Sequence, residues 1–399
     1  LLFFTYGGFF LQNLNWILTK LGGAPSEATF SILLPVGISF YTFQALGYTV
    51  DVYRGDVEAE KSFVRYALFV SFFPQLVAGP IERSKNLLHQ LKTPHPLTWL
   101  RLKRGFLLML WGFFQKLVIA DRVALLVNTV YGSWAQQPGS ALLLATAFFA
   151  VQIYCDFAAY SNIATGAARM LGIDLMQNFR QPYLATGVAD FWRRWHISLS
   201  TWFRDYLYIP LGGNRKGTAR KYFNIAVVFL ASGLWHGASW TFVVWGALHA
   251  LYQILEDVFL RPNHQAQPQK SFLPIRIVQT AVTFCFINIA WVFFRAATVS
   301  DGFAIIKKIF SDMSFAPLKA GGVYNLGLVK IEFIIAVAAI IVLFFVDLLR
   351  ECDFAVGYFA ATAPLLIQWV LGFSVLFAIL IFGMYSVGYT PSQFIYFQF

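Results

Sequence analysis

Residues 191–240 read FWRRWHISLSTWFRDYLYIPLGGNRKGTARKYFNIAVVFLASGLWHGASW and combine two kinds of segment. The first half is dense in arginine, lysine and tryptophan, whereas residues 222–234 contain almost no polar side chain. Tryptophan and basic residues are typical of a membrane–water interface, where the basic side chains face the cytoplasm. The sequence therefore predicts an interfacial segment, followed by a segment that enters the membrane.

His236 lies at the end of the apolar half. About 15 residues separate it from Lys221, which corresponds to roughly 22 Å of helix, and a hydrocarbon core is about 30 Å thick. If the helix enters from the basic side, His236 lies well inside the membrane. An ionisable residue at that depth indicates a functional site. The alternative is an interhelical hydrogen bond, which is a common use of a lone histidine in a span.

The composition is that of a membrane protein. Hydrophobic residues make up 58% of the chain and charged residues only 12%, whereas a soluble domain carries about 25% charged residues. The net charge of +11 falls mostly in short loops beside apolar runs, as the positive-inside bias expects. We therefore expect a bilayer environment and no nucleic-acid partner.

Apolar runs recur along the whole chain and predict an all-α polytopic protein. At about 20 residues per span, they predict eight to ten membrane segments. The basic segment 180–221 cannot span, because its charges recur every few positions, and it is expected to form amphipathic helices at the cytoplasmic face. We expect a single membrane-embedded domain over residues 1–399, and we take the apolar start without Met to mean that N-terminal spans are missing. The clearest simple spans are residues 331–349 and 365–388; residues 272–294 are a further span, and residues 139–173 form a long stretch with few charges.

Asp156 lies inside one of these apolar runs, in the sequence QIYCDFAAYSN (152–162). A carboxylate exposed to lipid is costly. Asp156 is therefore expected to face the protein interior or a water-filled cavity. It is either a hydrogen-bonding anchor between helices or a supporting residue of the site, and the sequence leaves both interpretations open.

The other histidines and the cysteines carry weaker signals. His89 and His95 are interpreted as solvated loop residues, and His249 as structural. No Cys/His spacing of a metal site or a disulfide framework occurs, so we predict neither zinc nor a disulfide. Buried, unreactive thiols are expected at Cys155, Cys285 and Cys352.

The candidates for chemistry are His236 and His196, with Trp235, Arg193 and Arg194 beside them. An imidazole held away from water stays largely neutral, because burial disfavours its charged form. A neutral imidazole can take a proton from a hydroxyl, which can then attack an acyl thioester if a dipole stabilises the oxyanion. Neither a GxxxxGK[ST] phosphate loop nor a GxSxG nucleophile motif occurs. The residues are thus compatible with acyl transfer by a histidine base, but their spacing alone does not separate this role from an interhelical hydrogen bond.

The chain resembles the membrane-bound O-acyltransferase family. Within that family it is most similar to the branch that acetylates bacterial polysaccharides, which includes the alginate O-acetyltransferase membrane subunit. The resemblance extends over nearly the whole chain. It rests on LPVGISFYTFQALGYTVDVYRG (34–55), FVSFFPQLVAGPIERS (69–84), YCDFAAYSNIATGAARMLGI (154–173), NFRQPYLATGVADFWRRWHISLSTWFRDYLYIPLGGNRKG (178–217), LASGLWHGASWTFVVWGALHA (230–250), AWVFFRA (290–296) and FIYFQF (394–399).

This resemblance implies the roles of the two histidines. The family's invariant histidine matches His236 in the WHG motif, and its second active-site histidine matches His196 in the RRWH motif. The family further implies a central funnel, with the acyl donor on the cytoplasmic side and the product on the other. No bound cofactor is expected, and acetyl-CoA is the expected donor.

The expected acceptor is a hydroxyl of an extracytoplasmic polysaccharide, or of a partner with a serine-esterase-like (SGNH) fold, at a bacterial cytoplasmic membrane. Relatives that transfer D-alanine to teichoic acid share the FW-x-RWH and WFRDY motifs, whereas YIPLGGNRKG (208–217) favours acetyl transfer. D-alanyl transfer remains an alternative. A transporter or exporter is the alternative from another class, since deep ionisable residues also mark transport pathways.

Overall fold

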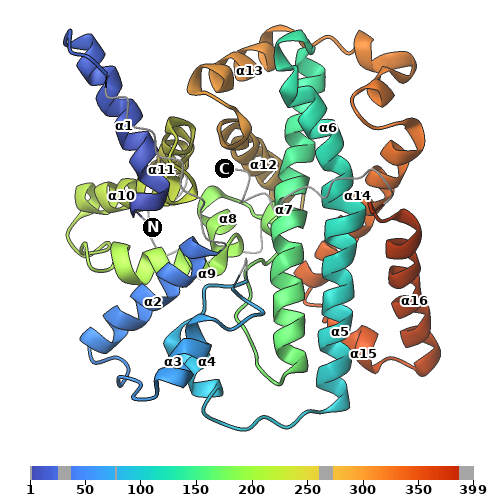
Figure 1. The fold of residues 1–399 in the computed structure, drawn as a ribbon. Helices are drawn as coiled ribbons and strands as arrows, with labels where there is room; N and C mark the ends of the chain where they lie inside the picture. Colours follow the sequence, from blue (N-terminus) through green and yellow to red (C-terminus); the bar gives the residue numbers. More distant parts are fainter. Residues whose placement is uncertain (1, 26–36, 77–78, 260–272, 386–399) are drawn as a thin grey trace.

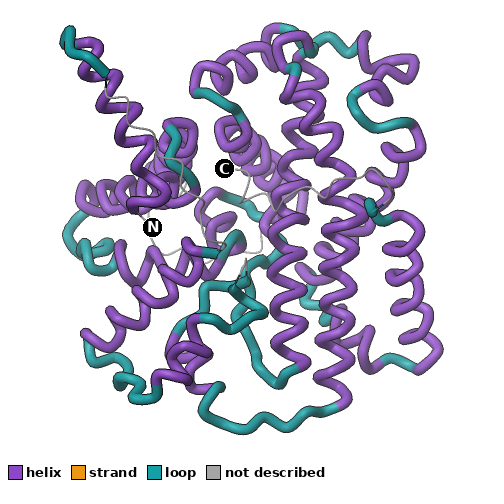
Figure 2. Tube along the Cα trace, viewed as in Figure 1, coloured by secondary structure: helices purple, strands orange, loops and turns teal. Residues whose placement is uncertain are grey.

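The computed structural model describes residues 2–25, 37–76, 79–259 and 273–385, and within these ranges every regular element is helical (Figure 2). The FIYFQF motif (394–399) lies outside the described residues. The helices are α1 (Leu2–Lys20), α2 (Ile38–Tyr53), α3 (Phe63–Val70), α4 (Ser84–Gln90), α5 (Trp99–Phe113), α6 (Asp121–Gly132), α7 (Gly139–Met170), α8 (Val188–Arg194), α9 (Ile197–Phe203), α10 (Thr218–His236), α11 (Trp240–Phe259), α12 (Leu273–Arg295), α13 (Val299–Ser311), α14 (Lys330–Glu351), α15 (Val356–Thr362) and α16 (Leu365–Phe382).

The long helices α5, α6 and α7 form one half of the molecule, with α14 and α16 on their outer side (Figure 1). Among the described helices, α7, α12, α14 and α16 are long and apolar enough to cross a membrane. Helices α14 and α16 correspond to the two clearest spans expected from the sequence, and α7 and α12 fall in two further apolar stretches, so the all-α membrane fold is confirmed. The total of eight to ten membrane segments stays a prediction.

A π-helical segment, Phe114–Ala120, joins α5 to α6. It contains Lys116, whose Nζ lies 2.6 Å from Asp156 Oδ1 on α7 and 2.9 Å from Asp121 Oδ1. The wider π turn leaves backbone groups without their usual helical partner, and the Leu117 carbonyl accepts a hydrogen bond from the Met384 amide at 3.0 Å. The connection between α5 and α6 therefore contains a change of helix type at its buried charges.

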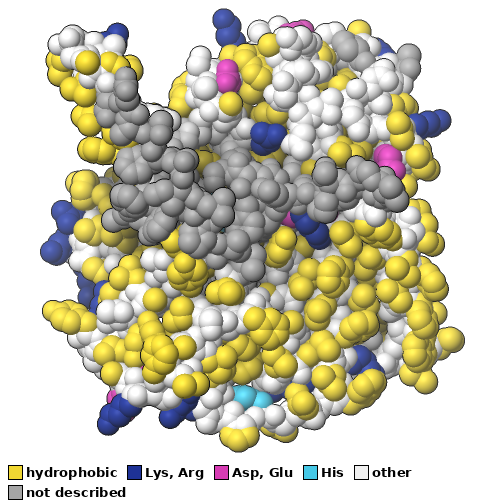
Figure 3. Space-filling model, viewed as in Figure 1, with side chains coloured by type: hydrophobic (Ala, Val, Ile, Leu, Met, Phe, Trp, Pro, Cys, Tyr) yellow, Lys and Arg dark blue, Asp and Glu magenta, His cyan; other side chains and the backbone are white. Residues whose placement is uncertain are grey.

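The outer surface of this half is apolar. Hydrophobic side chains gather over α5, α15 and α16 (Figure 3). Leu366, Val370 and Phe377 on α16 are each more than half exposed, as suits side chains that face lipid. Cys155 is buried, whereas Cys285 and Cys352 are exposed, so the expectation of buried thiols is wrong for those two.

The other half is built from short elements. The basic segment forms a 3₁₀ turn (Pro182–Leu184), α8, α9 and a second π segment, Arg204–Tyr208. Its short pieces agree with the prediction, but its tryptophans do not lie at an interface. They are buried inside the protein, because each indole packs on other rings, as Trp195 does on Phe191 at 5.4 Å between centroids. The buried indoles are those of Trp192, Trp195 and Trp202.

Helices α10 and α11 form a hairpin beside these short elements (Figure 1). A Cβ at Gly233 would lie 2.3 Å from the Phe242 carbonyl oxygen, and one at Gly246 would lie 2.3 Å from that of Phe229. The two backbones can approach this closely only because both residues lack a side chain, as small residues allow in membrane helices. This contact sets which residues of α11 face α10.

Candidate active site

His196 lies in the tight turn between α8 and α9, with φ 42° and ψ 55°. A non-glycine residue in this left-handed region is strained and persists only where its surroundings hold it. Asn178 provides the hold: its carbonyl accepts from the Ile197 amide at 2.9 Å, and its Oδ1 accepts from the Ser198 amide at 3.3 Å. Asn178 in turn donates to Ser161 Oγ on α7 at 2.9 Å. The turn is therefore fixed to the long-helix half.

The His196 ring is buried among aromatic side chains. Its centroid lies 4.6 Å from that of Phe157, which meets it edge-on from α7. Trp235, the residue before His236, lies 6.0 Å from it. Only 1% of His196 is exposed.

His236 is the last residue of α10 and is partly exposed. Its ring lies 4.9 Å from Trp235, 5.0 Å from Trp245 and 5.3 Å from Phe294. Trp235 thus contacts both His196 and His236, and the structure brings together the two histidines and the tryptophan that the sequence singled out.

The two arginines before His196 lie in different surroundings. Arg194 forms ion pairs with Asp190 at 3.0 Å and with Glu351 on α14 at 2.6 Å, and Glu351 also pairs with Arg276 on α12. Arg193 is largely exposed, at 64% of its side chain. Arg194 therefore ties the RRWH turn to α12 and α14, whereas Arg193, whose Nε lies 3.9 Å from Asp190 Oδ1, stays largely exposed.

Asp156 lies in the ion pair with Lys116, on a helix that also carries Phe157. The pair joins α7 to the π segment between α5 and α6. This is the interhelical contact that the anchor interpretation requires. A direct role of Asp156 in the reaction stays a prediction.

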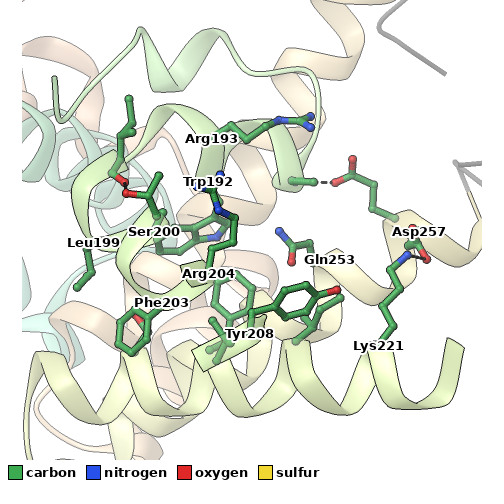
Figure 4. A pocket seen from close by; sticks show the side chains of 18 of the residues that line it. Trp192, Arg193, Leu199, Ser200, Phe203, Arg204, Tyr208, Lys221, Gln253 and Asp257 are labelled. Atoms are coloured by element: carbon green, nitrogen blue, oxygen red, sulfur yellow. Dashed lines mark hydrogen bonds and ion pairs between the residues drawn. The ribbon is translucent and has the colours of Figure 1, made fainter. Parts of the chain in front are cut away.

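A cavity of about 740 Å³ opens between α8, α9, α10 and α11. Its lining includes Ile197, which follows His196, and Ser232, which lies one helical turn before His236, whereas the two histidines are not among its lining residues. Its inner wall is aromatic, and Figure 4 shows Trp192 between Arg193 and Arg204. The charged side chains in its lining are Arg180, Arg193, Arg204, Lys221, Glu256 and Asp257.

Five of these six charged groups have defined partners among the described residues. Arg193 Nε lies 3.9 Å from Asp190 Oδ1, and Arg204 Nε lies 2.8 Å from Asp205 Oδ1. Lys221 Nζ lies 2.7 Å from Asp257 Oδ2, and Glu256 Oε2 accepts a hydrogen bond from the Ala189 amide at 3.0 Å. The lining carries four cations and two acids, so its net charge is positive and favours an anionic ligand. Within the described residues no group of three or more His, Cys, Asp or Glu side chains could hold a metal ion.

Sequence reasoning missed the cavity, and it interpreted His249 as structural, which stays a prediction. The imidazole of His249 is fully buried, and its Nδ1 accepts a hydrogen bond from Trp192 Nε1 at 3.2 Å. The signal was present in the glycines: Gly233 and Gly246 allow close packing of α10 and α11, which places His249 beside Phe229, with 6.0 Å between ring centroids.

The family model of the membrane-bound O-acyltransferases matches residues 59–299. A probable alginate O-acetylase from Pseudomonas putida is 41% identical over 310 residues, which cover 77% of this chain and 62% of that protein. A peptidoglycan O-acetyltransferase from Helicobacter pylori is 35% identical over 331 residues (76% and 61%). A teichoic acid D-alanyltransferase from Bacillus subtilis is 25% identical over 288 residues (66% and 69%).

The chain spans about three fifths of the length of the alginate relatives that it matches. The family match contains His196, His236, Trp235 and every residue that lines the cavity. A motif match and a folded site therefore coincide in one region. On this evidence, the chain belongs to the membrane-bound O-acyltransferase family.

Proposed function

We propose that this protein is a membrane O-acyltransferase that moves an acetyl group from a cytoplasmic thioester to a hydroxyl on the other side of a bacterial cytoplasmic membrane. The observation that carries the proposal is the position of the cavity. Its lining includes Ile197 and Ser232, which lie next to His196 and one helical turn from His236, respectively. An acyl donor in the cavity would thus have its reactive end at the layer of rings, Trp192 and Trp245, that packs against His236.

The donor that we propose is acetyl-CoA. Its phosphates suit the arginines of the cavity, because guanidinium groups bind phosphate in a bidentate manner. Arg193 and Arg204 are both largely exposed, at 64% and 61% of their side chains. The inner part of the cavity is apolar, with Phe229, Val228 and Leu199 in its wall, and suits the uncharged arm that carries the thioester.

His236 acts as the general base in this proposal. Its imidazole takes the proton of the acceptor hydroxyl while the oxygen attacks the thioester carbonyl carbon. The C–S bond then breaks, and the proton passes to the departing thiolate. His196 orients or polarises the acyl carbonyl. The partial exposure of His236 supports this division of roles, since a base must reach the acceptor, whereas His196 is buried.

The acceptor that we propose is a polysaccharide hydroxyl, or the serine of an extracytoplasmic esterase-like partner that modifies the polymer. Relatives named for alginate and peptidoglycan O-acetylation support this acceptor class. D-alanyl transfer is the second candidate, because teichoic acid D-alanyltransferases from Streptococcus thermophilus and Bacillus subtilis match at 29% and 25% identity.

The test uses the full-length protein in its native host. Base-labile acetate is released from purified envelope polysaccharide in the wild type, in a deletion strain and in a His236→Ala strain. The proposal predicts that acetate is lost from both altered strains while the variant protein remains in the membrane. Loss of D-alanine instead would favour the second candidate. No change in any acyl group would favour a transporter or a scaffold.

A further inference from the structure

His249 is a buried histidine that the proposed reaction does not use. It lies on α11 with no exposed surface, and its Nδ1 accepts the hydrogen bond from Trp192 Nε1. Because Nδ1 is the acceptor, the neutral ring carries its proton on Nε2. Among the described residues, that Nε2 has no hydrogen-bond partner. The bond to Trp192 is therefore the polar contact that defines how His249 sits.

Trp192 lines the cavity, and other aromatic rings lie between it and His236. The Trp192 centroid lies 5.2 Å from Phe229, which also lines the cavity. It lies 5.7 Å from Trp245, and Trp245 lies 5.0 Å from His236. A ligand in the cavity thus meets Trp192 before the layer of rings that contains His236. The position of the Trp192 ring sets how much room the end of the ligand has.

We propose that His249 is a positioning residue that fixes Trp192 and thereby restricts the donor to a short acyl group. The proposal rests on the proposed transfer from a thioester in this cavity. His249 itself contacts neither the donor nor the reacting atoms. It acts through the indole, whose N–H donates to His249 Nδ1 at 3.2 Å and would lose that acceptor if His249 were replaced.

The apolar contacts of Trp192 do not fix its orientation alone. Phe191, Phe229 and Trp245 meet the indole edge-on, and such ring contacts tolerate a range of geometries. A hydrogen bond is directional and weakens steeply when it bends. Removal of the acceptor on His249 should therefore free the ring without emptying the space around it.

The experiment measures transfer from acetyl and butyryl thioesters by the purified full-length protein in proteoliposomes, with kcat and KM per folded protein. His249→Phe keeps the ring and removes the acceptor, whereas His249→Asn keeps an oxygen near the position of Nδ1. We expect His249→Phe to lower the preference for acetyl over butyryl by about tenfold, the scale of a pocket that no longer excludes extra methylenes. His249→Asn should keep the wild-type preference.

A double-mutant cycle with Trp192→Phe identifies the hydrogen bond as the cause. Trp192→Phe removes the donor, so the double variant should show no further loss of preference beyond His249→Phe. The matched controls are His89→Phe and Trp369→Phe, because both residues are exposed and lie outside the cavity.

Two results would overturn the proposal. If His249→Phe and His249→Asn both keep the wild-type preference while less protein folds, then His249 is merely structural. If the two single losses of preference add in the double variant, the bond is not the cause. The wild-type rate separates this failure from that of the proposed function, which is overturned if the wild-type protein transfers neither acyl group.

Discussion

The two halves of the molecule satisfy their backbone hydrogen bonds in different ways. In the long-helix half, α7 runs unbroken from Gly139 to Met170 and its backbone groups pair within the helix. In the half that holds the site, residues 182–208 pass through a 3₁₀ turn, two short α-helices and a π segment. Irregular backbone at membrane depth is tolerated only where it is buried in protein or lines a cavity. The long helices thus provide the wall against which the irregular site is held.

The largest expected effect is a loss of transfer rate without a loss of folded protein. His236→Ala should lower acyl transfer by about 10²–10⁴-fold, the usual contribution of a general base. The amount of folded protein should stay close to wild type, because His236 ends its helix and is partly exposed. The measurement is the transfer rate per folded protein in membrane vesicles, with the exposed His89→Ala as control. A wild-type rate in His236→Ala would contradict the assignment.

The next effect lies in the long-helix half and should leave the chemistry intact. Lys116→Met leaves Asp156 and Asp121 buried without their cation, which costs about 3–5 kcal/mol for a broken buried pair. The melting temperature in detergent should fall accordingly. Adding Asp156→Asn and Asp121→Asn should restore much of the loss.

The same series decides between the two interpretations of Asp156. As an anchor, Asp156 can be replaced by Asn with a loss of stability but with an unchanged transfer rate per folded protein. A rate that falls while stability is kept would place Asp156 in the reaction. The long-helix half would then contribute to the chemistry as well as to stability.

The long-helix half was largely predictable from the sequence, and the site was predictable only in part. Runs of apolar residues depend on the bilayer thickness alone, so α12, α14 and α16 fall where the hydropathy places them. The pairing of His196 with His236 came from motif resemblance and is brought about by Trp235. The position of the Trp192 indole depends on a partner about 57 residues away in the chain, and local patterns carry no such information.

A smaller effect tests the strain in the site half. His196 has φ 42°, where a residue with a Cβ is disfavoured by about 1–2 kcal/mol and glycine is not. His196→Gly and His196→Ala should both lose acyl transfer, since each removes the imidazole. The glycine variant should nevertheless be more stable than the alanine variant by about 1 kcal/mol, measured by melting. Equal stability of the two variants would show that the turn carries no strain.

The smallest effect concerns Glu82, which precedes α4 outside the membrane-spanning helices. Burial raises the pKa of Glu82, although the Met176 amide and the Asn86 side chain donate to its carboxylate. The folded protein then binds this proton more tightly than the unfolded chain. Stability should therefore fall as the pH rises from the ordinary glutamate pKa of about 4.3 to the raised value.

Glu82→Gln should flatten this pH dependence. The measurement is the melting temperature across the acidic range, with the exposed Glu58→Gln as matched control. If the melting temperature of the wild type depends on pH as weakly as that of Glu82→Gln, then Glu82 does not cause a pH dependence of stability.

The most direct test of the central claim places a labelled acetyl thioester on one side of proteoliposomes and a hydroxyl acceptor on the other. We predict that the full-length wild-type protein forms a labelled ester on the acceptor and that His236→Ala forms at least about 100-fold less. If label crosses the membrane without an ester being formed, or if His236→Ala forms ester at the wild-type rate, then the cavity and the two histidines are not an acyl-transfer site.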